Sequence, residues 1–286
     1  MKKTTLLVLA SVALSLTACC SKEVSAKKDI AIQLWSVRDD IKADYAGTIS
    51  KLGEIGYTAV EAAGYSDGKF YGKTPEEFKA DVEKAGMYVL SSHTNKGLSD
   101  EELKSKNFSE SLKWWDEAIE AHKATGMKYI VVPSMIVPKT LEDLQTYCEY
   151  YNEIGKRSKE QGLSFGYHNH AFEFTKIEDR MMYDYLVENT NPEYVFFQMD
   201  VYWVVRGQQP PVEYFNKYPG RFHLLHIKDH EELGQSGMVG FDAIFNNIEI
   251  AGTKHIIVEV EKYNFTPLES VQKSLDYLNN SEFVKF

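Results

Sequence analysis

One short pattern of hydrophobic and polar positions recurs along the chain. An amphipathic stretch with helical spacing leads to a glycine, and a short apolar run follows. The glycines are Gly56, Gly86, Gly126, Gly162, Gly220 and Gly252. A glycine at this place adopts the left-handed conformation that ends a helix. A run that is apolar at successive positions is typical of a parallel strand covered on both faces. The pattern therefore predicts alternating helices and buried strands.

Eight strands are predicted in this way. Six follow the glycines, namely Tyr57–Ala62, Met87–Ser92, Met127–Pro133, Leu163–His168, Arg221–Ile227 and Thr253–Glu261. Two more, Ile30–Trp35 and Tyr194–Asp200, lack the preceding glycine. Eight strand–helix units in one uninterrupted stretch predict a single-domain α/β fold, a (β/α)₈ TIM barrel over residues 29–286. A doubly wound open sheet is the alternative, but the chain lacks the glycine-rich phosphate loop that such folds usually carry.

The helices between these strands have recognisable sequence signals. Thr74-Pro75 with Glu77 has the form of a capping box with proline in the first turn. Thr140 and Thr266-Pro267 are expected to open two further helices. Apolar residues recur at helical spacing in Ser109–Thr125 and Leu141–Gln161.

The N-terminal residues predict a compartment. Lys2 and Lys3 precede an apolar run from Leu6 to Leu16, which is too short to span a bilayer. Leu16-Thr17-Ala18-Cys19 then resembles a bacterial lipobox, which predicts a signal peptide over residues 1–18, lipidation of Cys19 and a polar tether over 19–28. An ordinary signal peptide cut after Ala18 is the alternative. We expect a cell-envelope lipoprotein, periplasmic or anchored at the outer membrane, that meets the membrane through its lipid alone.

Composition and charge exclude some classes of binding partner and metal site. The 286 residues include 32 Lys and Arg against 42 Asp and Glu, a formal net charge of −10. A chain this acidic, without a basic stripe, is poorly suited to a phosphate backbone, so nucleic acid is not expected as a partner. Apart from Cys19 and Cys20, the only cysteine is Cys148, so no disulfide framework or cysteine-based metal site is expected.

Polar residues gather where the predicted strands end. These residues are Glu61, His93, His168, His170, Glu173, Asp200, His226, Lys228, Glu259 and Glu261. The carboxyl ends of barrel strands meet at one mouth, where the chemistry of such folds takes place. Burying several carboxylates and imidazoles together is costly unless a cation compensates. Because histidine and carboxylate ligands suit Mn²⁺ or Zn²⁺, the set predicts one divalent metal ion.

Side-chain alternation separates the roles of neighbouring residues. His226 and Lys228 share one face of their strand, so Asp229 is expected to point away and to cap a helix or pair with a base. Glu259 and Glu261 also share a face. Glu259 lies deeper and is the expected metal ligand, and Glu261, which lies nearer the rim, is the alternative ligand.

At this point the residues resemble the xylose isomerase-like TIM-barrel family, often described as sugar phosphate isomerase/epimerase. The resemblance covers about residues 29–286. It is carried by the segments Gln33–Asp39, Gly56–Glu61, Tyr167–Phe174, Met199–Trp203, His226–Asp229 and Ile257–Glu259.

The resemblance implies one divalent metal held by Glu, Asp, His and Glu from the last four strands. Asp200, His226 and Glu259 match that pattern. The fifth strand departs from it, because it ends in Tyr167-His168-Asn169-His170. Glu173 folding back is the expected fourth ligand, and His168 or His170 ligating instead are the alternatives.

The family's chemistry implies proton abstraction next to a carbonyl through an enediolate. His168, His170 and Glu261 are the base candidates. Lys228 either holds an oxyanion or forms a salt bridge to Glu259 or Asp200. We expect four further residues to contact the substrate, namely Trp35, Glu61, His93 and Trp203. Core packing is the alternative for the two tryptophans.

The expected compartment selects the substrate. An envelope protein rarely meets sugar phosphates, so we expect an isomerase or epimerase of an unphosphorylated sugar or keto-sugar. Metal-assisted elimination from a 3-keto-glycoside is one alternative, because it uses the same enediolate. A lipid-anchored sugar-binding protein without catalysis is the other. The sequence leaves the oligomeric state open.

Overall fold

The computed structural model describes residues 28–286. The predicted signal peptide, Cys19 and nearly all of the predicted tether lie outside the described residues. Lys28, the last residue of that tether, already contacts the barrel. Its Nζ donates hydrogen bonds to the carbonyl oxygens of Leu278, at 2.8 Å, and Ser281, at 2.9 Å, where helix α12 (Pro267–Asn280) ends.

The described chain is a closed barrel of eight parallel strands, as predicted. The order around the barrel is β1-β12-β11-β10-β7-β6-β5-β2. The strands are β1 (Ile30–Gln33), β2 (Ala59–Ala62), β5 (Tyr88–His93), β6 (Tyr129–Val132), β7 (Ser164–His168), β10 (Val195–Asp200), β11 (Leu224–Lys228) and β12 (His255–Glu259). Each lies within or beside its predicted segment, so the (β/α)₈ architecture is confirmed.

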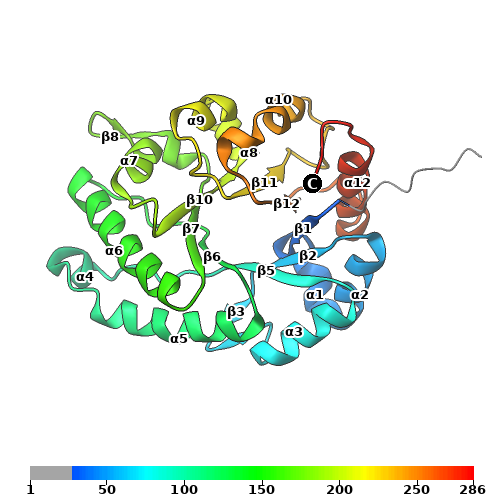
Figure 1. Cartoon of the computed structure of the whole chain (residues 1–286), viewed down its shortest axis with the longest axis horizontal. Coiled ribbons are helices and arrows are strands. Elements are labelled where there is room, and N and C mark those ends of the chain that lie inside the picture. The colour runs from blue at the N-terminus through cyan, green and yellow to red at the C-terminus, as the bar shows by residue number, and fades with distance from the viewer. Residues whose placement is uncertain (1–27) are drawn as a thin grey trace, which may run out of the picture.

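Helices surround the strands (Figure 1). They are α1 (Arg38–Ala43), α2 (Tyr45–Ile55), α3 (Pro75–Lys84), α4 (Asp100–Ser105), α5 (Ser109–Thr125), α6 (Leu141–Glu160), α7 (Met182–Asn189), α8 (Val201–Arg206), α9 (Pro211–Lys217), α10 (Phe241–Asn246), α11 (Ile248–Ala251) and α12. Short 3-10 turns, η1 (Leu34–Val37) and η2 (Phe172–Phe174), follow β1 and β7. Two hairpins, β3 (Tyr65–Ser66) with β4 (Lys69–Phe70) and β8 (Lys176–Ile177) with β9 (Arg180–Met181), complete the fold.

The backbone conformations expected at the helix ends are present in the structure. The six repeat glycines all have positive φ, from 75° to 119°. Thr74 and Glu77 form the predicted capping box at the start of α3. None of the helices between residues 28 and 286 is long and apolar enough to cross a membrane.

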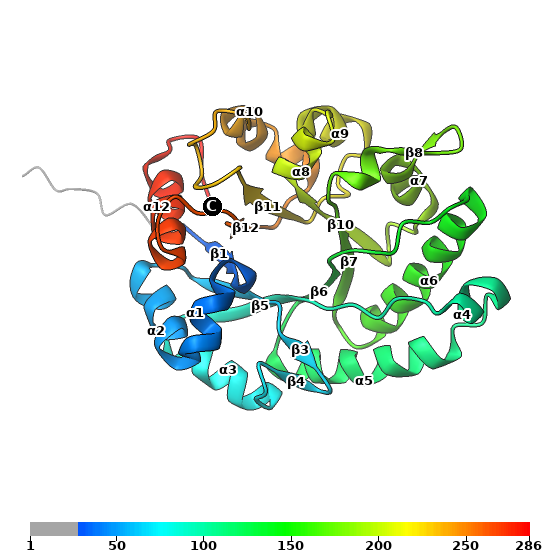
Figure 2. The same ribbon diagram turned by 180° about the vertical axis from the view of Figure 1, so that it is seen from behind.

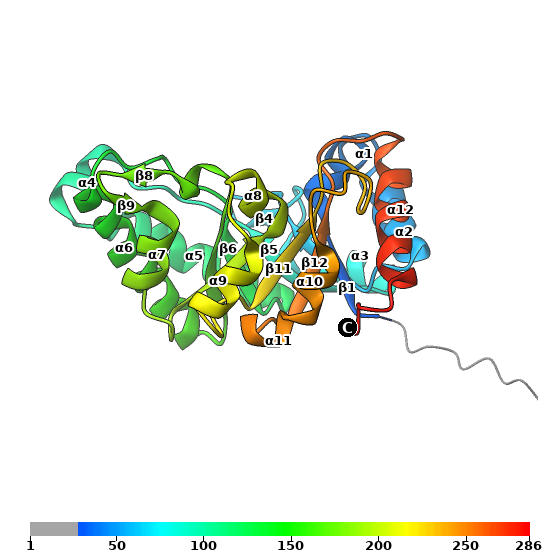
Figure 3. The same ribbon diagram turned by 90° about the horizontal axis from the view of Figure 1, so that it is seen from above.

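The barrel interior is layered because side chains on each strand alternate in direction. The lower layer is apolar and comprises Ala31, Ala59, Leu90, Tyr129, Val131, Phe196, Leu224 and Ile257. Two residues further along several of these strands lies a buried polar layer that includes Gln33, Glu61, Gln198, His226 and Glu259. The view from behind shows the same ring of helices around the strands (Figure 2). In the view from above, α1, which follows β1 and η1, and α8, which follows β10, both lie toward the upper edge of the molecule (Figure 3). This edge is the barrel mouth.

Candidate metal centre and substrate cavity

Four buried residues at the mouth form a candidate metal-binding group. They are His168, Asp200, His226 and Glu259, from the ends of β7, β10, β11 and β12. Each offers one ligand atom, and these four atoms lie within 4.8 Å of one another. Asp200 Oδ2 and His226 Nδ1 are buried without any hydrogen-bond partner. Since unpartnered buried polar atoms are costly, and since imidazole nitrogen with carboxylate oxygen suits Zn²⁺ or Mn²⁺, these residues fit a divalent cation.

Glu61 orients His226, one of the two histidines of this group. His226 Nε2 donates a 2.6 Å hydrogen bond to Glu61 Oε1, which leaves Nδ1 facing Glu259 Oε2 at 3.5 Å. A carboxylate behind a metal-binding histidine fixes the ring in this way. Burial opposes ionisation of Glu61, but His93 and His226 lower its pKa to about 2. Three further side chains donate to the same carboxylate at 2.6–2.8 Å, namely Gln33, Ser91 and Gln198.

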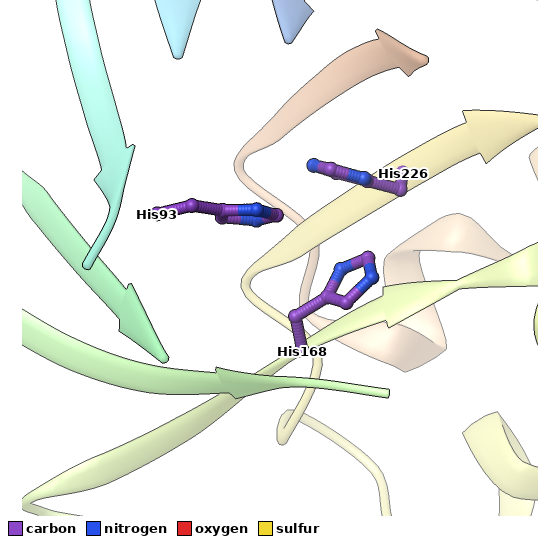
Figure 4. Close-up of side chains that lie close together, drawn as sticks. All are labelled: His93, His168 and His226. Carbon is purple, nitrogen blue, oxygen red and sulfur yellow. The ribbon is translucent and has the colours of Figure 1, made fainter. Parts of the chain in front are cut away.

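Gln198 joins two of the histidines, His93 and His168, to Glu61, and it was not among the predicted site residues. Its Oε1 accepts from His93 Nε2 at 2.7 Å and from His168 Nδ1 at 3.1 Å, while its Nε2 donates to Glu61. His93, His168 and His226 point toward one another (Figure 4). With Nδ1 of His168 engaged as a donor, Nε2 of that ring is free to bind a cation. Gln198 lies two residues before Asp200, so strand alternation was the signal that would have placed it at the mouth.

The His93, His168 and His226 side chains also form a second possible metal group. His93 Nε2 is already bonded to Gln198, and it lies 3.1 Å from Glu61 Oε1. His226 Nε2 is likewise held by Glu61. The four-residue group is therefore the better site, because its unpartnered atoms are available.

Replacing Gln198 by leucine should weaken divalent metal binding by about 10- to 100-fold, the usual effect of losing a group that orients ligands. The substitution removes the acceptor that fixes His168 and a donor to Glu61. Titration of the purified protein with Mn²⁺ against a chelating dye measures the change. Gln145→Leu, which alters a glutamine on the outer helix α6, is the matched control. An unchanged affinity in Gln198→Leu would show that this network does not support the site.

Lys228 places a fixed positive charge beside the group. Its Nζ lies 2.6 Å from Glu261 Oε2 and 3.7 Å from Glu259 Oε2. Burial opposes the charge, but Glu259, Asp200 and Glu261 raise the pKa of Lys228. Lys228 and His226 in turn hold the pKa of Glu259 well below its usual range despite burial. Desolvation raises the pKa of Asp200 to about 7. Of the two alternatives for Lys228, the salt bridge to Glu259 is present, but Glu261, which was not predicted as a partner, lies nearer.

A cavity of about 360 Å³ opens above these residues, within the range usual for small-molecule sites. Its walls are Trp35, Ala63, His93, Pro133, Ser134, His168, His170, Glu259 and Glu261. His170 Nδ1 is buried without a partner, and burial lowers the pKa of this imidazole. A neutral imidazole facing a cavity is suited to accept a proton.

Two of the predicted substrate-contacting residues do not line this cavity. Glu61 is fully buried and holds His226 instead. Trp203 packs beside the cavity wall, with its ring 5.6 Å from that of His170 and 5.8 Å from Lys228 Nζ. Trp35 and His93 do line the cavity.

The structure does not bring Glu173 to the four-residue group. Its carboxylate accepts a 2.7 Å hydrogen bond from the Tyr167 hydroxyl and a 2.8 Å bond from the His170 backbone N–H. Tyr167 packs against Tyr151 of α6, on the helix side of β7, whereas His168 faces the barrel interior. Burial raises the pKa of Glu173 to about 7. Among the three alternatives for the fifth strand, the geometry places His168 in the ligand group.

Asp229 also differs from its predicted role. It accepts hydrogen bonds from the backbone N–H groups of His230 and Gly234 and from the Ser236 hydroxyl. It organises the loop after β11 and neither caps a helix nor pairs with a base.

The family model described as "Xylose isomerase-like TIM barrel" matches residues 49–281 of the chain. Two crystal structures of sugar phosphate isomerase/epimerase from Parabacteroides distasonis are 32% and 33% identical, with TM-scores of 0.84 and 0.85. They cover 90% and 92% of this chain, and the matches span 100% and 97% of the crystallised chains.

More distant relatives differ in their described activities. Inosose dehydratase from Geobacillus kaustophilus is 25% identical over 197 residues, which make up 63% of this chain and 60% of that relative. A structure of the IolI protein with a bound zinc atom is 15% identical, with a TM-score of 0.68, and covers 90% of this chain and 98% of that one. The second likeness concerns the fold alone.

Proposed function

Because the chain belongs to the xylose isomerase-like TIM-barrel family, we propose that it is a metal-dependent isomerase or epimerase of an unphosphorylated sugar or keto-sugar. The observation that carries this proposal is the buried group of His168, Asp200, His226 and Glu259, with its two unpartnered atoms, at the floor of a sugar-sized cavity.

The four residues would hold one divalent ion, Mn²⁺ or Zn²⁺. When bound, such an ion polarises a carbonyl and its neighbouring hydroxyl. The donor set of imidazole nitrogen and carboxylate oxygen supports this assignment. Lys228 adds a permanent charge from the protein itself. Since its pKa is raised, it stays protonated beside Glu259 and Glu261. From behind the cavity wall, its charge would stabilise the negative oxygen that develops when a carbon acid loses its proton.

Two groups in the cavity wall can move the proton. His170, at the end of β7, is the base with a free buried nitrogen. Glu261 follows β12, which is separated from β7 by β10 and β11 around the barrel. The two groups therefore approach the substrate from different sides. Returning the proton to a neighbouring carbon isomerises the sugar, and returning it to the opposite face of the same carbon epimerises it.

The cavity walls favour a substrate without phosphate. No arginine or lysine is among the residues that line it. Phosphate is usually held by arginine or by a helix N-terminus. Turnover of a panel of ketoses, 3-keto-glycosides and their phosphates, followed by proton NMR with Mn²⁺ or Zn²⁺ added, tests the proposal. Turnover of phosphorylated sugars alone would contradict it, and binding without turnover would favour the non-catalytic alternative.

Elimination is the second candidate, favoured by the inosose dehydratase relatives. After His170 takes the proton next to the carbonyl, the electron pair forms a carbon–carbon double bond. The β carbon–oxygen bond breaks, and its electrons leave with the departing oxygen, which takes up a proton. The same NMR panel separates this outcome, because it yields an unsaturated ketone.

We also propose that Cys19 carries a lipid that anchors the protein in the cell envelope, on the basis of the Leu16–Cys19 signature. Cys19→Ala should release the protein from the membrane fraction or block its processing. Fractionation with immunoblotting measures the release, and Cys148→Ala is the matched control. Mass spectrometry that finds an unmodified N-terminus at residue 19 would contradict the anchor.

A further inference from the structure

A second cavity adjoins the first at the barrel mouth. It measures about 370 Å³ and, like the first, has Trp35 and Ala63 in its wall. Its other walls come from η1, α1, the start of α2 and the loop after β4. We name it the side cavity. Because Trp35 and Ala63 belong to both walls, a ligand bound in the first cavity would reach the side cavity past these two residues.

Trp35 is held in place at this boundary although its side chain is exposed. The residue is 45% exposed, yet the guanidinium of Arg38 lies 4.9 Å from the centre of its ring. Arg38 also donates to the Trp35 carbonyl at 3.0 Å and to the Tyr263 hydroxyl at 2.9 Å. Tyr263 in turn donates to the Ser36 carbonyl. An exposed indole fixed before binding offers a flat apolar face at low entropic cost.

The side cavity differs chemically from the mouth. Apolar and aromatic side chains dominate it, including Leu34, Ile41, Tyr45 and Tyr71. Its charged members are Arg38 and Lys42, and no carboxylate lines it. Arg38 is already engaged by Trp35 and Tyr263, so one exposed lysine is the free charge in this lining. A ring with an apolar face suits these walls better than a phosphate does.

We propose that the side cavity binds the second ring of a glycoside whose reacting sugar ring lies in the mouth cavity. The inference rests on the proposed function and names its substrate class. This class is a keto-glycoside, in which the oxidised sugar ring is still joined to a second ring, its glycosidic partner. The partner is either a second pyranose or an aromatic aglycone, since both present a six-membered ring with an apolar face. In the elimination reaction this ring would be the leaving group, released as an alcohol.

Binding of unoxidised probes tests this inference without any turnover. Isothermal titration of the metal-loaded protein compares glucose, cellobiose, 4-nitrophenyl β-glucoside and glucose 6-phosphate. We expect at least one two-ring probe to bind about tenfold tighter than glucose or better, given the additional buried atoms. The probe that gains affinity identifies the ring. Trp35→Ala should remove this gain, while Met238→Ala should keep it, because Met238 is similarly exposed, at 43%, and lines neither cavity.

Three outcomes would overturn the inference. The first is equal affinity for glucose and both two-ring probes. The second is an equal loss for one-ring and two-ring probes in Trp35→Ala, which would confine Trp35 to the mouth cavity. The third is tighter binding of glucose 6-phosphate alone, lost in Lys42→Glu, which would make the side cavity a phosphate site. Two-ring binding without turnover of any keto-sugar would instead uphold this inference and refute the proposed function.

Discussion

Replacing Asp200 and His226 together by alanine is expected to lower divalent metal affinity by more than about 100-fold. Groups that only orient a ligand contribute about 10- to 100-fold, so loss of two direct ligands should exceed that range. The two residues are two of the four members of the group, and each carries a buried atom without a hydrogen-bond partner, Asp200 Oδ2 and His226 Nδ1. Elemental analysis after dialysis measures metal per chain, and circular dichroism monitors the fold.

A matched control exists at the other end of the barrel. His255 Nδ1 and Asp29 Oδ2 lie 3.7 Å apart at the start of β12 and just before β1. Asp29→Ala/His255→Ala removes the same two residue types and should keep the metal. If the Asp200/His226 variant fails to fold, Asp200→Asn keeps the side-chain shape while removing the charge. Full metal occupancy in either mouth variant would refute the site.

His170→Gln is expected to lower kcat and kcat/KM together by about 100- to 10,000-fold, the range for one general base. Glutamine fills much of the same space but cannot take up the proton. Because His170 is outside the four-residue group, metal content should stay at the wild-type level. Steady-state kinetics on the keto-sugar that the wild type converts, together with elemental analysis, measures both effects.

His168→Gln should affect metal content differently from His170→Gln. Its imidazole belongs to the four-residue group, so this variant should lose metal as well as turnover. Near-normal turnover in His170→Gln would move the base elsewhere, and Glu261, which also lines the cavity, would become the leading candidate. Metal loss in His170→Gln would instead assign that residue to the ligand group.

The barrel was predictable because its signals are local. A glycine such as Gly126 ends a helix by its own backbone conformation, and Tyr129–Val132 follows as a strand because its residues are apolar on both faces. The mouth residues Asp200, His226 and Glu259 were predictable for the same reason. Asp200 and Glu259 end their strands and His226 lies two residues before the end of β11, and in a parallel barrel those strand ends must meet.

The hydrogen-bond network was not predictable, because it joins residues distant in sequence. Gln198 and Glu61 are 137 positions apart, and only the closed barrel brings their side chains within 2.8 Å. The position of Glu173 could not be predicted from the sequence either. After His168 the chain turns, with Asn169 accepting a hydrogen bond from the Asp200 backbone N–H, and η2 then carries Glu173 behind the strand toward Tyr167. A spacing argument along β7 cannot foresee that turn.

Hydrogen–deuterium exchange at a substrate carbon tests whether the barrel mouth removes a proton next to a carbonyl. The metal-loaded protein is incubated in D₂O with a 3-keto-glucoside, and deuterium is followed by NMR at the carbons next to the carbonyl. We expect enzyme-dependent exchange at one of these carbons, and we expect this exchange to disappear in His170→Gln and after chelation of the metal. Product formation without any exchange at those carbons, or exchange that persists in the chelated protein, would contradict proton abstraction at the barrel mouth.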